Sequence, residues 1–527
     1  MCARLRSISI VSLATSASRV LGLLRDVCLF AFLGTGPVSS AFILAFTLPN
    51  LFRRLLGEGA LTSAVVPVLS RKLEQDGPAA QDALLNAVLR RLAVVLCGLS
   101  VLMALGWLAL PLIPGLAERW YLSSGYGVVL TPYLILICLA AILSAALNVR
   151  ERFFVPAMSQ VWLNLSMIAA LGGLGWAFGD TPEQRAWWLS GGVLVGGILQ
   201  WLTPWLDLQK AGWDRTAGRG EKTDLRPVWN LFLPGVFGAA IFQVNVLVSR
   251  LLAFSLNDQA TGILYLANRL IELPLGVFAV AVSTVLFPEL ARYAAREDGQ
   301  EAFAEGYHHG WRLIMLITVP AALGLAVLAE PILSALFAWG LFGADDVAAT
   351  VLPLQIFAIA VPFYSWATLA TRAFHAQQDM RTPVRLAVLN LVLNLGLSLA
   401  LMGPLGTPGL ALANLLTSVV HCLLLAWLLR RYRVALVTPA TGWAAVKIMA
   451  AGAVMVAAIY FAEPIGTGLV GGLLQALKLG TEPKLLDAGL IALLIPLGMA
   501  LYFATLFLLR ETELHALFAA VRKKLGR

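Results

Sequence analysis

The chain contains, at residues 18–33, the stretch SRVLGLLRDVCLFAFL. With the apolar residues before it, this stretch has the length and hydrophobicity of a helix that crosses a lipid bilayer. It nevertheless carries Arg19, Arg25 and Asp26. A charged side chain at the centre of a membrane costs about 2.5–3.5 kcal/mol even on a lenient insertion scale, so such groups usually face a partner or an interior cavity. The stretch therefore predicts both a membrane fold and an internal polar site.

The rest of the chain continues this apolar pattern. Hydrophobic residues make up 59% of the 527 positions and charged residues 13%, which is too apolar for a soluble domain of this length. Because apolar runs of spanning length recur, we predict an all-α polytopic membrane protein with about fourteen transmembrane helices. The expected spans are 8–33, 40–70, 83–113, 129–149, 156–178, 187–208, 227–254, 261–291, 308–337, 348–374, 383–402, 408–429, 443–462 and 486–510. Kinks are expected at Pro49, Pro67, Pro274 and Pro288.

Basic residues alternate between two sets of loops. One set holds most of them, from Arg4 and Arg6 to the C-terminal tail, and the other set holds only Arg119, Arg185, Lys478 and Lys484. By the positive-inside rule the first set is cytoplasmic, so both termini are expected in the cytoplasm. The same distribution explains the net charge of +9 without nucleic acid. The signal-like N-terminus is interpreted as the start of the first span, because its apolar run continues past Arg19.

The sequence offers little for catalysis or metal binding. The five cysteines lack paired spacing, so no disulfide and no metal site is expected. No phosphate-binding loop of the G-x-x-x-x-G-K-[ST] type occurs, which argues against ATP hydrolysis, and no Ser-His-Asp arrangement stands out. The glycines at 191–192 and 196–197 are interpreted as close-packing positions between helices.

The chain repeats itself weakly at an offset of roughly 220–230 residues. VPVLSR at residues 66–71 corresponds to FPELAR at 287–292, and LNL at 163–165 to LNL at 389–391. An even number of spans per repeat preserves orientation, which predicts two pseudo-symmetric six-helix lobes and two additional helices. The expected parts are an N-lobe at 1–210, a C-lobe at 211–433 and an accessory pair with a cytoplasmic tail at 434–527. Substrate sites of repeated transporters lie near the midplane between repeats.

Several charges lie within these spans. Arg54 and Glu58 are four residues apart and Arg269 and Glu272 are three apart, so each pair can interact along a helix. One interpretation is that all the charges pair internally and hold helices together. For three arginines we favour another interpretation, because too few carboxylates lie near them in sequence, and a guanidinium suits phosphate well. These candidates for binding an anion are Arg25, Arg53 and Arg269.

Four motifs resemble those of a known family. They are SRVLGLLRD at 18–26, AFILAFTLPNLFRRLLGEGA at 41–60, ANRLIELP at 267–274 and QDMRTP at 378–383. Together they resemble the MurJ (MviN) lipid II flippases of the MOP transporter superfamily, over about residues 8–510. The resemblance implies a flippase of the bacterial inner membrane that moves lipid II from the inner to the outer leaflet for peptidoglycan and cell wall biogenesis, by alternating access.

The resemblance also implies roles for residues and partners. Arg25, Arg53 and Arg269 would bind the diphosphate, and the last two helices would form a groove for the lipid tail. The cavity or its gates would be shaped by Arg19, Asp26, Arg54, Glu58 and Glu272. The expected partners are lipid II and membrane lipids, the expected state is a monomer, and association with the cell-wall synthesis machinery stays open.

The chain departs from the family pattern at acidic positions. Ser40 and Asn268 stand where many members have Asp. Some members bind sodium, and the corresponding polar residues here are Ser249 or its neighbours, with Asn390 and Asn394 as a possible ion site. Because carboxylates are missing, sodium coupling is not predicted and no cofactor is expected.

Other functions remain as alternatives. Within transporters these are a flippase for another polyprenyl-diphosphate oligosaccharide and a MOP-type drug or cation antiporter, which should rely on buried carboxylates. A non-transporting scaffold would tolerate neutral residues in place of the arginines. A membrane glycosyltransferase would need an acidic donor site that the sequence does not offer.

Overall fold

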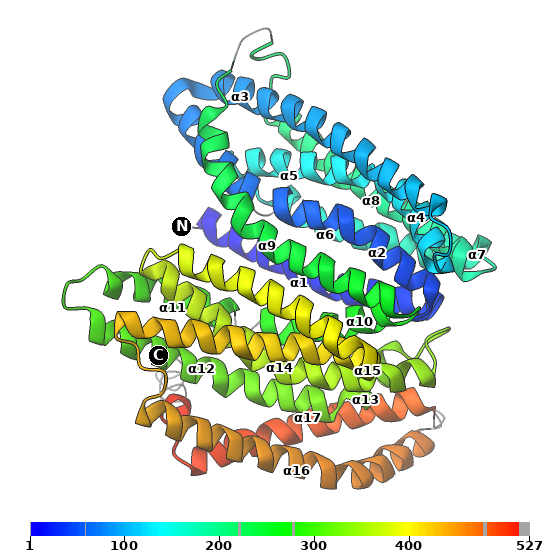
Figure 1. Cartoon of the computed structure of the whole chain (residues 1–527), viewed down its shortest axis with the longest axis vertical. Coiled ribbons are helices and arrows are strands. Elements are labelled where there is room, and N and C mark those ends of the chain that lie inside the picture. Colours follow the sequence, from blue (N-terminus) through cyan, green and yellow to red (C-terminus); the bar gives the residue numbers. More distant parts are fainter. Residues whose placement is uncertain (1, 58–59, 220–222, 277–279, 478–481, 516–527) are drawn as a thin grey trace. The chain divides into compact units, whose positions relative to one another are not determined.

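The computed structural model describes residues 2–57, 60–219, 223–276, 280–477 and 482–515. Within these ranges the regular structure is entirely helical (Figure 1). Packing divides the chain into two compact units. The first unit is Met1–Gly262 with Trp339–Phe342, and the second unit is Ile263–Ala338 with Gly343–Arg527. The division by packing thus falls later in the chain than the lobe boundary expected at 210/211, and the expected lobes remain a prediction.

The first unit begins with the helix that carries Arg19, Arg25 and Asp26. Its elements are α1 (Cys2–Leu33), α2 (Pro37–Phe52), η1 (Arg53–Gly57), α3 (Ala60–Ala109), η2 (Leu110–Leu112), α4 (Glu118–Leu130), α5 (Tyr133–Val149), α6 (Phe154–Ala169), η3 (Ala170–Gly175), α7 (Trp176–Phe178), α8 (Pro182–Lys210) and α9 (Arg226–Leu256). One apolar core joins α3 and α5 through Leu69, Leu84 and Leu147. Leu225 and Val228, at the start of α9, are buried in the same core, which is why α9 belongs to this unit.

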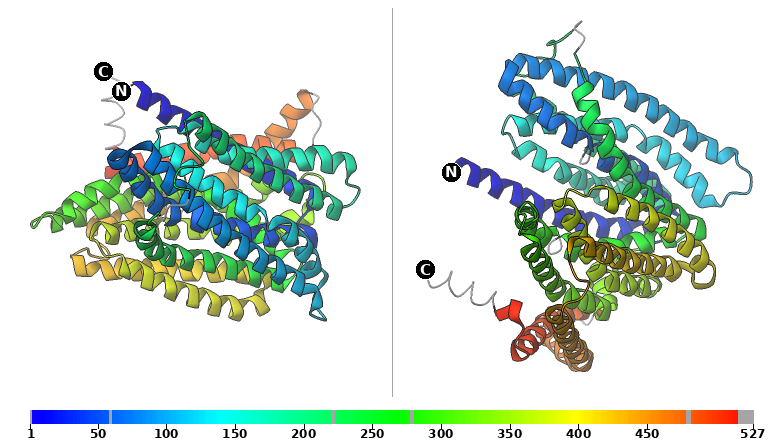
Figure 2. Two further views of the ribbon diagram at one scale, coloured as in Figure 1. Left: turned by 90° about the horizontal axis from the view of Figure 1, so that it is seen from above. Right: turned by 60° about the vertical axis from the view of Figure 1, so that its left-hand side comes forward.

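The second unit contains the remaining helices. They are α10 (Ala260–Pro274), which begins at the boundary, α11 (Val280–Ala294), α12 (Gln300–Val327), α13 (Ala329–Phe337), α14 (Ala344–Ala376), α15 (Arg381–Leu428), η5 (Leu429–Tyr432), α16 (Pro439–Ala476) and α17 (Pro483–Leu508). The last two, α16 and α17, lie side by side as a pair (Figure 2). Tyr502 of α17 is fully buried and donates to the carbonyl of Leu316 in α12 at 3.0 Å, so the pair is anchored to the unit.

Many of the helices are long and apolar enough to span a membrane. Among the described residues eight helices meet this criterion, or nine if the bent pair α4 and α5 forms one span. Two of the eight, Pro37–Leu112 and Arg381–Tyr432, contain 76 and 52 residues, although about 20 suffice for one crossing. Each is interrupted by a glycine outside helical geometry, Gly77 with φ of 82° and Gly406 with φ of 60°. Each therefore contains two of the expected spans, and the expected count of about fourteen is approximate.

Two of the expected kinks coincide with a change of helix type. Pro49 lies within α2, and the π-helical turn η1 begins four residues later at Arg53. In the second unit, Leu275 and Gly276 adopt π-helical geometry directly after Pro274. Proline removes a backbone donor and crowds the carbonyl of the preceding turn, and a π-helical turn is one way to relieve the crowding.

The helices α5 and α14 end in the same way. Glu151 and Gln378 each have a left-handed backbone with φ of 59°. The next amides, of Arg152 and Asp379, each donate to a carbonyl of the last helical turn at 2.9 Å, as in a Schellman motif. The two ends are separated by the same roughly 220–230 residues as the sequence motifs, so the backbone supports the internal repeat.

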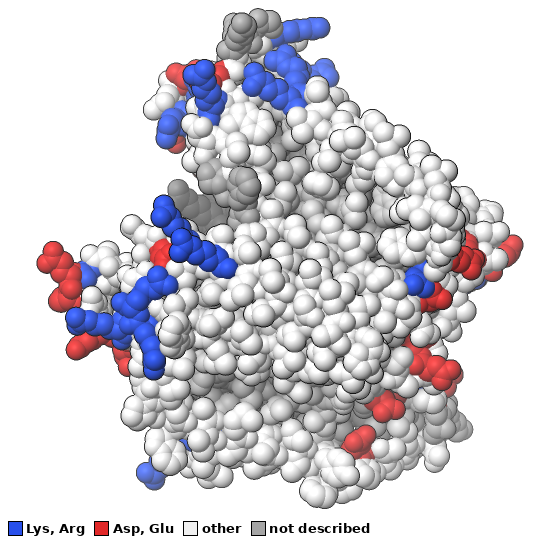
Figure 3. All heavy atoms as spheres, viewed as in Figure 1, with Lys and Arg blue, Asp and Glu red and all other residues white. Residues whose placement is uncertain are grey.

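The charged side chains of the first unit are unevenly distributed. On the face drawn in Figure 3, its helices are almost free of charge along their middle, and basic residues gather at the end where α8 is followed by α9. Arg215 and Arg219, between α8 and α9, and Arg226, the first residue of α9, are exposed. This is the pattern that the positive-inside rule describes for a cytoplasmic surface.

Candidate functional site

Arg25 of α1, in the first span expected from the sequence, is a charged residue with several described contacts. Its Nε and Nη2 donate to the same oxygen of Asp26, at 3.0 and 2.6 Å. Its Nη1 donates to Oδ1 of Asn164 in α6 at 3.1 Å. The Arg25 side chain is 11% exposed and Asp26 is fully buried. The contacts that hold this guanidinium in place thus include a carboxylate and a neutral amide.

These contacts correct one expectation. Too few carboxylates were expected near Arg25, and that was wrong, because the adjacent residue Asp26 forms an ion pair with it. Asn164 was overlooked as a site residue. The available signal was that Asn164 is a polar residue in an apolar run and belongs to one of the repeated motifs.

Arg53 lies at the first position of the π-helical turn η1. Its Nε donates to Oδ1 of Asn50, one turn earlier, at 2.8 Å. The expected partner of Arg54, Glu58, lies outside the described residues, so that pairing stays a prediction. Arg19 of α1 is exposed. Arg25 on α1 and Arg53 at the end of α2 therefore both belong to the first unit.

Arg269 lies on α10 in the second unit. Its Nη1 is 2.7 Å from Oε2 of Glu272, so the ion pair expected from their spacing is present. Both side chains are partly exposed, at 30% and 37%.

The two possible ion ligands on α15 have different surroundings. Asn394 is buried, and its amide lies 3.2 Å from Oδ1 of Asn414 and 3.3 Å from Oγ1 of Thr417. Oδ1 of Asn390 is buried and has no hydrogen-bond partner among the described residues. No group of three or more His, Cys, Asp or Glu side chains is arranged to hold a metal ion in the part of the chain that the structure describes.

Ser40, which replaces an expected carboxylate, has a structural partner. It is fully buried in α2 and donates to the carbonyl of Asp258 at 2.6 Å. Arg119, at the start of α4, binds the carboxylate of Asp258 at 2.7 Å and the carbonyl of Phe254 at 2.7 Å. The C-terminal end of α9 is therefore fastened to α2 and α4 by a serine and an arginine, within the first unit.

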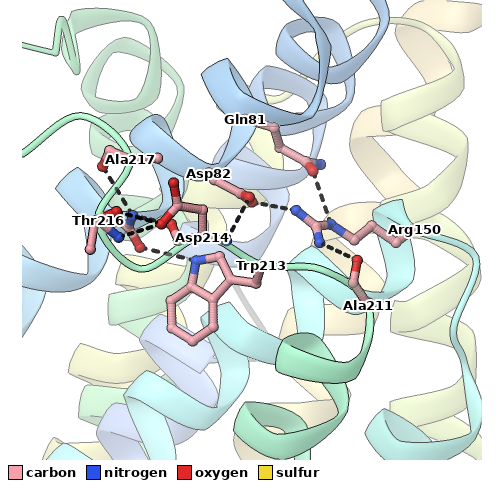
Figure 4. Close-up of polar contacts among 9 residues, drawn as sticks. Gln81, Asp82, Arg150, Ala211, Trp213, Asp214, Thr216 and Ala217 are labelled. Carbon is pink, nitrogen blue, oxygen red and sulfur yellow. Dashed lines mark hydrogen bonds and ion pairs between the residues drawn. The ribbon is translucent and has the colours of Figure 1, made fainter.

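The other end of α9 follows a segment that is held by a second polar cluster (Figure 4). Arg150, at the end of α5, forms an ion pair with the buried carboxylate of Asp82 and donates to Oε1 of Gln81 at 3.0 Å. The other oxygen of Asp82 accepts the amide of Asp214 at 3.0 Å. Three further contacts lie farther along this segment: Asn86 donates to the carbonyls of Asp214 and Ala217, and its own Oδ1 accepts Nε1 of Trp213. The cluster thus ties the segment after α8 to α3.

Asp214, which follows α8, and Asp379, which follows α14, are held in their charged form. Hydrogen bonds from the hydroxyl and amide of Thr216 lower the pKa of Asp214. Burial alone would raise the pKa of Asp379, but the hydroxyl and amide of Thr382, with Arg431, hold that pKa below its ordinary value. Both carboxylates lie between helices, so they fasten connecting segments.

Comparisons with known proteins agree with the helical architecture. The sequence model of the family described as "Lipid II flippase MurJ" matches residues 29–477. A "Probable lipid II flippase MurJ" of Rhizobium meliloti (strain 1021) is 32% identical over 525 residues, covering 97% of this chain and 95% of that protein. A protein of the same description from Vibrio cholerae serotype O1 is 32% identical and covers 96% of each chain.

Two solved structures have the same fold. "Lipid II flippase MurJ, inward closed conformation" gives a TM-score of 0.74 at 24% identity, over 95% of this chain and 99% of that one. A multidrug resistance MATE family transporter of the MOP superfamily, in an inward-facing conformation, gives 0.66 at 13% identity, over 79% and 94%. At these identities the structural likeness establishes the fold alone.

Proposed function

The chain belongs to the lipid II flippase MurJ family, and on that basis we propose that it translocates lipid II with Arg25, Arg53 and Arg269 as ligands of the diphosphate. It is a multi-pass protein of the bacterial inner membrane, and its family is one of transporters rather than enzymes. Lipid II carries a diphosphate between a polyprenyl tail and a large polar headgroup. A protein that moves this molecule across a bilayer needs a cationic group inside the membrane, because the diphosphate must leave water.

The assignment of Arg25 to the diphosphate is supported by the contacts that fix its side chain. A guanidinium within a spanning helix is costly, yet this one is fixed by Asp26 and Asn164 rather than directed to the membrane surface. Its planar fork matches phosphate oxygens. Asp26 reduces the net charge of the group, which favours reversible binding: a flippase must release the diphosphate as well as capture it.

We infer that transport proceeds by alternating access. Structures titled inward-facing and outward-facing conformations of a MATE family transporter have this fold, with TM-scores of 0.66 and 0.53. The termini are cytoplasmic in this proposal, which the exposed basic residues after α8 support. The protein acts as a monomer, and the lipid tail stays in the membrane beside α16 and α17.

The test is rescue of a bacterium depleted of its own lipid II flippase. The wild-type chain should restore growth and lipid II translocation, whereas Arg25→Ala, Arg53→Ala or Arg269→Ala should abolish translocation at equal membrane protein level. Arg215→Ala is the matched control, because Arg215 is exposed and stacks on Trp205. This variant should behave as wild type.

Two results would contradict the proposal in different ways. Normal translocation by Arg25→Ala or Arg269→Ala would remove that arginine from the binding site. Failure of the wild-type chain to restore lipid II translocation, although it is inserted and folded, would favour another polyprenyl-diphosphate substrate.

A further inference from the structure

Asn164 makes two hydrogen bonds to α1 at once. Its Oδ1 accepts Nη1 of Arg25 at 3.1 Å, and its Nδ2 donates to the carbonyl of Ser18 at 3.1 Å. A guanidinium only donates and a carbonyl only accepts, so an amide is the group that satisfies both partners. Asn164 is 4% exposed, so breaking either bond leaves a buried polar group without compensation.

The two bonds connect the side chain of Arg25 to the backbone of its own helix. Ser18 lies seven residues before Arg25, which is about two turns of α1. Asp26 holds the Nε and Nη2 side of the guanidinium, while Asn164 holds the Nη1 side. The plane of the guanidinium is therefore fixed from two directions, by a carboxylate on α1 and an amide on α6.

We propose that Asn164 is a positioning residue for lipid II translocation, which sets the orientation of Arg25 toward the diphosphate. This inference rests on the proposed function of Arg25. A bidentate contact with phosphate depends on the direction of the guanidinium plane, so an arginine that rotates freely loses part of its affinity. An amide does this without adding negative charge, whereas a carboxylate in the place of Asn164 would add one negative charge beside Arg25 and would oppose an anionic ligand.

The test compares Asn164→Leu with Gln200→Leu. Gln200 of α8 is also a fully buried amide of the first unit; it donates to Ser159 of α6 at 2.9 Å and accepts from Tyr133 at 3.1 Å, and these bonds do not involve an arginine. Purified variants in liposomes are assayed with a fluorescent lipid II analogue over a range of concentrations. Asn164→Leu should raise the half-saturating concentration about tenfold, the effect of losing a hydrogen bond to a charged group. Gln200→Leu should leave it unchanged for the folded fraction.

A second measurement follows Arg25 without any transport. Phenylglyoxal modifies accessible, mobile guanidinium groups, and peptide mass spectrometry reports its rate at Arg25. The rate should rise in Asn164→Leu and stay at the wild-type value in Gln200→Leu. In Asn164→Asp, Arg25 should stay protected while the half-saturating concentration rises, because the acceptor is kept and a negative charge is added.

The results separate the two proposals. If Asn164→Leu and Gln200→Leu have the same labelling rate and the same half-saturating concentration, Asn164 only packs helices and the inference is wrong. If Asn164→Leu does not fold, Asn164→Asp takes its place: labelling of Arg25 that is faster there than in the wild type, although the acceptor is kept, overturns the inference. If labelling rises as expected but Arg25→Ala transports lipid II normally, Asn164 positions Arg25 and the assignment of Arg25 to the diphosphate fails.

Discussion

Glu151 and Gln378 have the same left-handed backbone conformation, with φ of 59°, at the ends of α5 and α14. Both residues lie outside the helices in the same kind of helix end, one in each half of the repeat. A side chain in this conformation costs about 1–2 kcal/mol, which is why glycine is the usual residue there.

Replacing either residue by glycine should therefore stabilise the protein. We expect Glu151→Gly and Gln378→Gly each to raise the free energy of unfolding by about 0.5–1 kcal/mol, because relief of the left-handed cost exceeds the added entropy of the unfolded chain. Thermal unfolding in detergent measures the change. Gly212→Ala is the control of opposite sign, because Gly212 has φ of 82° and an added Cβ meets no atom within 4 Å. A lower midpoint for both glycine variants would disprove the argument.

The neighbouring glycines 191 and 192 of α8 should respond differently to alanine. A Cβ on Gly192 would lie 2.4 Å from Cβ of Ala170 and 2.9 Å from the carbonyl of Ser166, whereas one on Gly191 meets nothing within 4 Å. Gly192→Ala should destabilise the protein by about 1–3 kcal/mol, the usual cost of overpacking. Gly191→Ala should be neutral or slightly stabilising in the same unfolding assay. Equal effects would mean that α8 can move away from α6 at little cost.

The ion pair between Asp82 and Arg150 should matter far more than an exposed one. Asp82→Ala leaves the nearly buried Arg150 without its carboxylate, and removing one partner of a buried pair costs about 3–5 kcal/mol. It also removes the acceptor for the amide of Asp214, so limited proteolysis should cut the segment after α8 faster. Asp76→Ala is the matched control, since its pair with Lys72 is about half exposed and is worth about 0–1 kcal/mol. Comparable losses in the two variants would contradict the importance of burial.

Translocation should not depend on sodium. Asn390 and Asn394 stand at the expected ion position, and the contacts of Asn394 include the neutral side chains of Asn414 and Thr417. Replacing sodium by potassium at constant membrane potential should leave the rate of lipid II translocation in liposomes unchanged. A rate that falls severalfold without sodium, and that no longer responds to sodium in Asn394→Ala, would establish the coupling that we do not expect.

Local spacing predicted some of the site from sequence. The pair Arg269 and Glu272 follows from three-residue spacing on a helix, which fixes which side chains are neighbours. The pair Arg25 and Asp26 did not follow from the same rule, because adjacent residues point about 100° apart on a helix. The side chain of Arg25 is long enough to reach Asp26 nevertheless. The spacing of residues along a helix does not take the length of a side chain into account.

Contacts between distant segments were the part that the sequence did not reveal. Asn164 meets Arg25 only because α6 packs on α1, and a weak apolar repeat does not fix which faces meet. The cluster around Asp82 includes the segment between α8 and α9. This segment has no periodic pattern from which its contacts could be predicted. Hydrophobicity and charge bias were sufficient for the helical class, since they depend on composition and not on which faces are in contact.

The π-helical turns after Pro49 and Pro274 have a consequence for how this chain can change in length. Such a turn contains one more residue than the α-helical turn that it replaces. Loss of one residue from 53–57 would convert the turn to an α-helical one and keep the faces of the residues on its two sides in register. A deletion elsewhere in these helices would rotate everything beyond it by about 100° and bring apolar surface to the wrong side. The two halves of the chain can therefore diverge by single-residue insertions and deletions at these turns without loss of the membrane fold.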